Sequence, residues 1–181
     1  MKPTNRTTKP IRTLDDIQRL KQAARSSSSR DYMMIVTLLN TGLRISDAIR
    51  LKPLHIRNGR LSIDQVKTGK RYDVQLNPAF YAELSLYLHG MDSQTFIFQS
   101  RNGGNISRTQ AFRIIKRCGQ AIGIDISAHT LRKTFGYQFY METKDIAQLT
   151  KIFGHSRPSI TLDYIDITKD EIDESMAAFY L

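Results

Sequence analysis

Apolar residues recur every three to four positions along most of the chain, which is the spacing of one helix face. Thr13 followed by Asp16 is typical of a helix start, and Gly42 stands where a second helix would end. The pattern predicts helices over residues 14–25, 30–41, 45–51, 78–88, 107–122, 130–141, 144–153, 158–164 and 168–179.

Between two of these helices the period changes to the alternation that is typical of strands. Leu61 and Ile63 follow the pair Asn58-Gly59, which suits the primed turns of β-hairpins. After a second turn at residues 67–70, alternation resumes over residues 72–76. The sequence therefore predicts an α+β protein that is mainly helical, a helical bundle with a small three-stranded antiparallel sheet at one edge.

The charge of the chain is unevenly distributed. The 181 residues suffice for one domain with a full hydrophobic core, and the formal net charge is +10. Residues 1–70 carry 15 Lys and Arg against 5 Asp and Glu, whereas residues 71–181 carry 12 basic and 12 acidic residues. A field polarised in this way attracts polyanions such as nucleic acid, and a basic surface without a partner is the alternative.

Cysteine content and hydropathy indicate the cellular compartment of the protein. Cys118 is the single cysteine, which excludes a disulfide framework and fits a reducing compartment. No apolar run approaches the roughly 20 residues of a membrane span, and residues 1–6 lack the apolar core of a signal peptide. We therefore expect a cytoplasmic protein with no membrane partner.

Residues 1–12 are rich in Lys, Arg and Pro and poor in apolar residues. We expect a flexible basic arm that lies along phosphates, with a plain disordered terminus as the alternative. The folded domain then comprises residues 13–181.

Two arginines stand near predicted helix starts. Arg44 follows Gly42, where its charge opposes the helix dipole but where the free N–H groups and the guanidinium can together hold an anion. Arg132 lies three residues after His129, so the pair can present a proton-transfer group and a bidentate fork to one phosphate. Each motif has an ordinary alternative, because Arg44 can pair with Asp47 at the surface and the His-x-x-Arg spacing is frequent by chance.

Further polar residues lack a local structural explanation. Lys67 and Lys70 lie in the tight turn between two predicted strands, His155 follows Gly154 at a helix end, and Tyr164 comes nine residues later. Turn lysines commonly face solvent, a Gly-His pair commonly caps a helix, and a tyrosine in this setting is commonly core. Taken together with the arginines, these residues indicate a phosphate site.

The order of these features resembles the catalytic domain of the tyrosine recombinases, the phage integrase family. The resemblance covers nearly the whole chain, from about Pro10 to Phe179. It is carried by the segments Thr41–Asp47, Val66–Gly69, His129–Arg132 and Gly154–Ser156 and by Tyr164.

The resemblance implies a site-specific DNA recombinase that acts in integration, excision or inversion. Such an enzyme cleaves and rejoins double-stranded DNA through a 3′-phosphotyrosyl link, with chemistry like that of type IB topoisomerases, and Tyr164 would be the nucleophile. Neither a metal ion nor another cofactor is required, because the bond energy is kept in the phosphotyrosine. The alternatives are a DNA-binding regulator or accessory protein of the same fold without turnover, and a nicking and closing enzyme.

The resemblance also assigns roles around the nucleophile. Arg44 and Arg132 would clamp the non-bridging oxygens, and His155 would hydrogen-bond the phosphate. Lys67 would protonate the leaving 5′-oxygen, and His129 would assist proton transfer at the tyrosine. Phosphoryl-transfer chemistry agrees with these roles, because fixed cations can stabilise the charge on the equatorial oxygens.

The chain departs from the family pattern at two points. Asp47 stands where the family more often has glutamate, so its support of Arg44 would have a shorter reach. Most members also carry a separate N-terminal DNA-binding domain, so residues 13–181 correspond to the catalytic domain alone, as in short single-domain members or in a fragment. The expected DNA contacts come from the hairpin turn and the helix over residues 107–122, namely Lys70, Arg108, Arg113, Lys116 and Arg117.

The last predicted helix, residues 168–181, is acidic and carries an apolar stripe of Ile172, Met176 and Phe179. In the family, the segment after the tyrosine often packs into a neighbouring protomer, which implies a dimer or tetramer on DNA and a monomer in free solution. The alternative is that the stripe packs onto its own chain.

Overall fold

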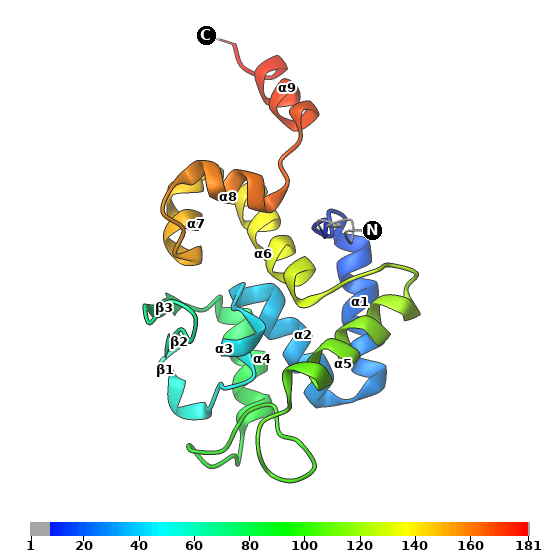
Figure 1. The fold of residues 1–181 in the computed structure, drawn as a ribbon, viewed down its shortest axis with the longest axis vertical. Coiled ribbons are helices and arrows are strands. Elements are labelled where there is room, and N and C mark those ends of the chain that lie inside the picture. The colour runs from blue at the N-terminus through cyan, green and yellow to red at the C-terminus, as the bar shows by residue number, and fades with distance from the viewer. Residues whose placement is uncertain (1–7, 181) are drawn as a thin grey trace, which may run out of the picture.

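The computed structural model describes residues 8–180, without the side chains of Glu174 and Ser175. The helices of this range are α1 (Leu14–Ser27), α2 (Ser29–Thr41), α3 (Ile45–Ala48), α4 (Pro78–Leu88), α5 (Arg108–Ala121), α6 (Ala128–Thr143), α7 (Ile146–Phe153), α8 (Pro158–Ile165) and α9 (Lys169–Ala177). A 3-10 turn over Pro53–His55 leads into β1 (Ile56–Arg57), β2 (Arg60–Asp64) and β3 (Arg71–Gln75). The predicted α+β fold, mainly helical with a small antiparallel sheet at one edge, is confirmed (Figure 1).

Helix α2 is the centre of the larger core. Its residues Met34, Ile35 and Leu38 are fully buried, and the helix packs against α1 and α6. Ser28 separates α1 from α2 and caps the second helix, because its hydroxyl accepts the N–H of Asp31. This packing fixes the C-terminal end of α2, from which the chain turns into the functional site.

Gly42 ends α2 in the left-handed conformation, with φ of 59°. A Cβ at this position would lie 2.2 Å from Cδ1 of Phe135 on α6. Only glycine satisfies both the backbone angle and this close approach of two helices. The predicted helix stop is therefore also the place where α2 and α6 touch, two residues before Arg44.

The sheet follows the predicted hairpins, in the order β1-β2-β3. Asn58 and Gly59 both have positive φ, 50° and 74°, as a primed turn requires. Ile63 pairs with Tyr72 in the register of β2 and β3, and both side chains are buried. The Tyr72 hydroxyl donates a 2.5 Å hydrogen bond to the Thr41 carbonyl oxygen, so the sheet is attached to the end of α2.

A smaller core joins α7 and α8 to α6. It contains Leu149, Phe153 and Ile165, all fully buried. A Cβ on Gly136 would lie 2.7 Å from Ile165 and from Phe153, so this glycine lets both helices approach α6 closely. From this core α9 projects away from the body of the molecule (Figure 1).

Several helix boundaries differ from the prediction, as three examples illustrate. Helix α3 ends at Ala48 rather than at residue 51, because Leu51 bonds to Ala48 in a tighter i to i−3 turn. Helix α7 begins at Ile146 rather than at residue 144, because Lys144 ends α6 in the left-handed conformation (φ 54°) and Asp145 then caps α7. Helix α9 ends at Ala177, so Phe179 lies beyond it.

The prediction of a flexible arm over residues 1–12 is wrong for its last residues, while residues 1–7 lie outside the described range. Pro10 and Ile11 are buried, and the Ile11 N–H donates to Thr134 Oγ1 at 2.8 Å. Arg12 forms an ion pair with Glu171 at 2.5 Å. The apolar Ile11 and the paired charge of Arg12 attach this segment to the folded body. All helices within residues 8–180 are too short or too polar to cross a membrane.

Candidate functional site

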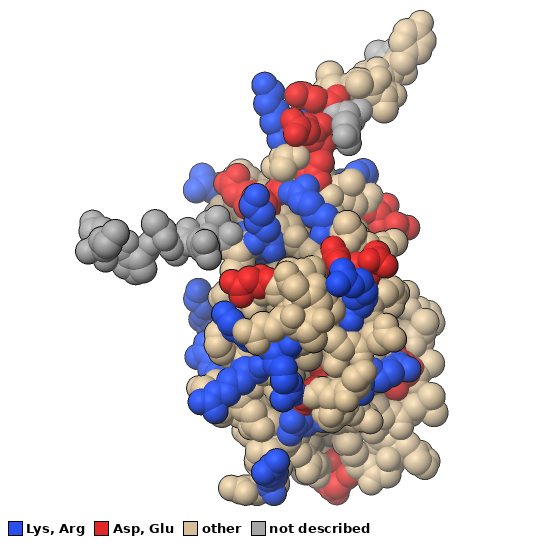
Figure 2. All heavy atoms as spheres, turned by 90° about the vertical axis from the view of Figure 1, so that its right-hand side faces the viewer, with Lys and Arg blue, Asp and Glu red and all other residues tan. Residues whose placement is uncertain are grey.

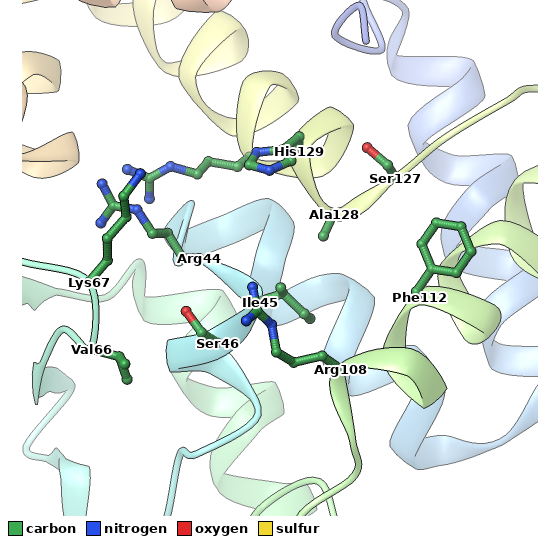
Figure 3. A pocket seen from close by; sticks show the side chains of 11 residues that line it. Arg44, Ile45, Ser46, Val66, Lys67, Arg108, Phe112, Ser127, Ala128 and His129 are labelled. Atoms are coloured by element: carbon green, nitrogen blue, oxygen red, sulfur yellow. The ribbon is translucent and has the colours of Figure 1, made fainter. Parts of the chain in front are cut away.

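A cleft of about 640 Å³ lies where α3, the β2–β3 turn, α5 and the start of α6 meet. Cationic and imidazole side chains from four separate segments line it, together with smaller and apolar residues. The charged and imidazole members are Arg44, Lys67, Arg108, His129 and Arg132. In Figure 3 the ends of Arg44 and Lys67 extend toward the same side of the cleft, from opposite elements. Four of the six predicted catalytic residues therefore share one cleft.

Arg44 is the N-cap residue of α3 and has extended backbone angles. Its half-buried side chain donates through Nη1 to Oε1 of Gln65, at the base of the β2–β3 turn. The guanidinium is thus oriented by a neutral amide oxygen.

Lys67 lies in the β2–β3 turn and is exposed. The turn is held by Asp47, whose Oδ1 accepts the N–H of Val66 at 2.9 Å. Asp47 is completely buried on α3. The expectation that Asp47 supports the Arg44 side chain is therefore wrong. The short aspartate side chain binds the backbone of the turn, and Gln65 contacts the arginine instead.

Arg132 is only 5% exposed, in the second turn of α6. Its Nη1 donates to the Gly42 carbonyl oxygen and its Nη2 to the Phe153 carbonyl oxygen, the latter at 3.2 Å. The guanidinium carbon lies 4.2 Å from the centre of the Phe153 ring. Burial, aided by the charge of Arg44, lowers the Arg132 pKa to about 10, so the group remains a cation at neutral pH. Arg132 therefore ties the ends of α2 and α7 together at the edge of the cleft.

Both predicted catalytic histidines, His129 and His155, lie within the field of this cation. Burial lowers the pKa of His129, and the positive charges of Arg132, Lys133 and Lys67 lower it further. Burial likewise lowers the pKa of His155, with Arg132 contributing. Both imidazoles are thus neutral at neutral pH and are able to accept a proton.

Tyr164, on α8, belongs to an aromatic cluster behind Arg132. Its ring meets that of Phe153 edge-on, with centroids 5.5 Å apart, and that of His155 at the same distance. The His155 Nδ1 lies 2.9 Å from Thr161 Oγ1, which holds the imidazole in place. Burial raises the Tyr164 pKa, while the charges of Arg132 and then Arg44 lower it, so the phenol lies within the field of both guanidinium groups. The predicted nucleophile therefore packs against the ring that the Arg132 guanidinium covers.

The predicted DNA-contacting residues separate into different surroundings. Arg108 lines the cleft, whereas Arg117 points to the α1–α2 junction and pairs with Asp31 at 2.8 Å. That pairing occupies Arg117, because Asp31 is buried and needs a counter-charge. Of the others, Lys116 pairs with Asp125 at 3.4 Å, and Lys70 and Arg113 are exposed.

Basic side chains gather along one edge of the molecule. Figure 2 shows Lys and Arg prevailing along the left edge of the body in that view. Near the C-terminal extension at the top, acidic and basic side chains are mixed.

The sequence prediction missed three polar residues of the site, Gln65, Lys133 and Thr161. The burial of Gln65 was predictable, since Gln65 continues the inward-facing alternation of Leu61 and Ile63. It is 6% exposed. Lys133 is 9% exposed, and its Nζ lies 5.5 Å from the centre of the Tyr164 ring. The contacts of Lys133 and Thr161 depend on how α6, α7 and α8 pack, which no local pattern encodes.

Comparisons with known proteins agree with this geometry. The model of the phage integrase family matches residues 12–171. The chain is 41% identical over 164 residues to "probable integrase/recombinase YoeC" of Bacillus subtilis, covering 89% of this chain and 91% of that protein. It is 25% identical over 170 residues to tyrosine recombinase XerA of Pyrococcus furiosus, covering 91% of this chain and 59% of that longer protein.

Solved structures share the fold. A crystal structure of XerA recombinase has a TM-score of 0.81 at 23% identity, covering 99% of this chain and 67% of that chain. A lambda integrase tetramer bound to a Holliday junction has a TM-score of 0.73 at 20% identity, covering 88% of this chain and 48% of that chain. With most of its residues matched by the family model, the chain belongs to the phage integrase family.

Proposed function

We propose that this chain is a site-specific DNA recombinase that cleaves and rejoins DNA strands through a 3′-phosphotyrosyl intermediate on Tyr164. The observation that carries the proposal is the packing of Tyr164 against Phe153, the ring that the Arg132 guanidinium covers, while Arg132 shares its cleft with Arg44. Membership in the phage integrase family supports the same activity.

In the proposed cleavage step, the Tyr164 oxygen attacks the scissile phosphorus and the bond from phosphorus to the 5′-oxygen breaks. The phenol proton passes to His129, whose lowered pKa makes it a neutral acceptor in the free protein. The leaving 5′-oxygen takes a proton from the Lys67 ammonium. Attack by a 5′-hydroxyl reverses these transfers and releases the tyrosine, so the same chemistry serves recombination and the nicking and closing of a single duplex.

The two arginines stabilise the charge that develops on the non-bridging oxygens. Arg132 is held in advance by backbone carbonyls of two elements, so little reorganisation accompanies catalysis. His155, fixed by Thr161, is a further hydrogen-bond donor to the phosphate through its second ring nitrogen.

The exposed lysine turn gives the reaction a dependence on bound DNA. Lys67 is free of ion pairs among residues 8–180 and is exposed. DNA phosphates order such a side chain and bring its proton to the leaving oxygen. The high pKa of the buried Tyr164 phenol keeps the nucleophile protonated until then.

Double-stranded DNA is the proposed partner. Arg108 contacts it from the cleft, and Lys70, Arg113 and Lys116 contact its phosphates from the surrounding surface. Arg117, paired with Asp31, contributes only through its long-range charge. Binding of this kind weakens steeply as salt concentration rises.

We further propose that copies of the chain assemble as a dimer or tetramer on DNA and are monomers when free. Helix α9 projects from the body, and Ile172 and Met176 on it are 54% and 65% exposed. Phe179, just beyond the helix, is 64% exposed and extends this apolar stripe. Burial of the stripe against a second copy would remove it from water. Sedimentation with and without DNA tests this, since Met176→Glu should abolish the larger complex and leave the DNA-bound monomer.

The function is tested with a pool of short, random-sequence duplexes, each nicked so that one short cleaved strand diffuses away. Religation is then prevented, and covalent adducts that survive denaturation accumulate and can be sequenced. Wild type and the matched control Tyr81→Phe should form the adduct, and Tyr164→Phe should form none while still retaining the duplex.

Two results would contradict the proposal in different ways. An adduct in Tyr164→Phe would show that another residue is the nucleophile, and peptide mapping of the adduct would identify it. DNA retention by wild type without any adduct would favour a DNA-binding regulator of this fold.

A further inference from the structure

Gln65 occupies an inward-facing position at the end of the second strand. Along β2, Leu61 and Ile63 are 1% and 3% exposed, and Gln65, in the same register, is 6% exposed. It is the first residue after β2 and begins the turn that carries Lys67. A buried amide needs hydrogen-bond partners to replace the water it has lost. The identity of those partners therefore indicates what this position does.

The side chain and the backbone of Gln65 contact different parts of the site. Its Oε1 accepts from Nη1 of Arg44 and from Oγ1 of Thr68, the latter at 3.3 Å. Its N–H donates to the Lys70 carbonyl oxygen at 3.0 Å, and its own carbonyl oxygen accepts the N–H of Gly69 at 2.9 Å. One residue thus closes the base of the lysine turn and holds the arginine beside it.

A second connection joins the same two elements. The Val66 N–H donates to Asp47, and Asp47 lies on α3, the helix that begins after Arg44. The β2–β3 turn, which carries Lys67, is therefore attached to the start of α3 at two points. One is the buried Gln65 side chain, and the other is the Val66 N–H. A displacement of the turn relative to α3 has to break at least one of these bonds.

The Gln65 amide carries no charge, and this affects how Arg44 can bind a phosphate. A carboxylate at position 65 would also accept a hydrogen bond from Arg44, but it would pair with the cation and compete with a phosphate for it. An amide oxygen orients the guanidinium and leaves its charge available.

We propose that Gln65 is a positioning residue that couples the two cations of the cleft, orienting Arg44 toward the phosphate and fixing the turn from which Lys67 reaches the leaving oxygen. This inference rests on the proposed recombinase function. The inference predicts that the buried Gln65 amide controls both phosphate binding and leaving-group protonation. The amide itself contacts neither the phosphate nor the leaving 5′-oxygen.

The first test requires no DNA. In nitrogen-15 NMR spectra of the full chain, the Arg44 Nε–H signal should be sharp in wild type and broadened in Gln65→Leu. Gln75→Leu is the matched control, since Gln75 lies on the same sheet and donates to the Gly59 carbonyl oxygen at the far end of the hairpin. An unchanged Arg44 signal in a folded Gln65→Leu would show that Gln65 does not position Arg44, independently of any activity on DNA.

The second test measures single-turnover cleavage of the duplex recovered from wild-type adducts, with two modified scissile groups. Gln65→Leu should cleave the normal diester about 100-fold more slowly than wild type, as expected for a small misplacement of reacting groups. A methylphosphonate has no negative charge to clamp, and a 5′-bridging sulfur leaves without needing a proton. Each modification should narrow the gap between Gln65→Leu and wild type, because each removes the need for one of the two cations.

Gln65→Glu separates orientation from charge. It should restore a sharp Arg44 signal and still cleave the normal diester slowly, since the new carboxylate pairs with the arginine. Rescue by only one modified substrate would overturn the coupling of both cations to Gln65, and rescue by neither would reduce Gln65 to a general packing role. If wild type itself forms no adduct, the proposed function fails, while the NMR comparison still decides whether Gln65 orients Arg44.

Discussion

The site has two sides that are built differently. On the side of α6, α7 and α8, Arg132 is 5% exposed, its guanidinium bonds to two backbone carbonyls, and Tyr164 packs in an aromatic cluster. On the hairpin side, Lys67 is exposed in a turn that a few hydrogen bonds attach to α3. The first side holds its charge in place before substrate arrives, and the second depends on substrate to order its lysine. Stability and catalysis should therefore be inseparable on the buried side and separable on the hairpin side.

The largest effect is expected from Arg132→Ala. The variant loses a preorganised cation, so single-turnover cleavage should fall by about 1,000-fold or more. It also loses both carbonyl contacts and the stacking on Phe153, so the free energy of unfolding should fall by about 3 kcal/mol. Cleavage assays and urea titration measure the two losses. Arg57→Ala, at an exposed arginine of β1, is the control, and a fully stable Arg132→Ala would contradict the structural part.

The second effect is expected from Lys67→Ala. Loss of the general acid should slow cleavage of a normal diester by about 100-fold to 10,000-fold. The free energy of unfolding should change by less than about 0.5 kcal/mol, because the side chain is exposed. A 5′-bridging sulfur should restore most of the rate in Lys67→Ala and little of it in Arg132→Ala. Equal rescue of both variants would remove the distinction between the two sides.

A smaller effect is expected from Thr161→Val, which keeps the shape of the side chain and removes its hydroxyl. His155 then loses the 2.9 Å contact at Nδ1, and Thr150 loses its 3.0 Å contact. Cleavage should slow by about tenfold, as when a group that orients a site residue is removed. Thr143→Val is the matched control, because its hydroxyl contacts backbone groups, the Phe139 carbonyl oxygen and the Asp145 N–H, at the exposed end of α6. An unaffected rate in Thr161→Val would show that His155 needs no such support.

The two sides also differ in how far the sequence predicts them. The hairpin was predictable, because Asn58-Gly59 sets the turn and alternation sets which side chains of β2 face inward. The helix end at Gly42 was predictable too, since glycine suits that backbone angle. By contrast, the partner of Asp47 depends on how far an aspartate reaches once α3 and the lysine turn are packed. The pairing of Arg117 with Asp31 likewise arises between helices that lie far apart in the sequence.

The smallest effect expected is a change in histidine titration. Burial lowers the pKa of His129 and of His155, and the Arg132 charge lowers both further. Between the unfolded value of about 6.5 and the lower folded values, the unfolded chain binds more protons, so the free energy of unfolding should decrease as pH falls through this range. Above about pH 7 both states are neutral at these residues and this dependence disappears.

Arg132→Gln tests the source of the shift, because it keeps a polar side chain and removes the charge. Proton NMR titration should give higher pKa values for His129 and His155 in this variant than in wild type. His55 is the internal control, since its pKa is lowered by burial and then by Lys52 and Arg50, without Arg132. A parallel rise at all three histidines would indicate general loosening of the fold. A rise confined to His129 and His155 would show that the charge of the buried cation lowers the pKa of both histidines.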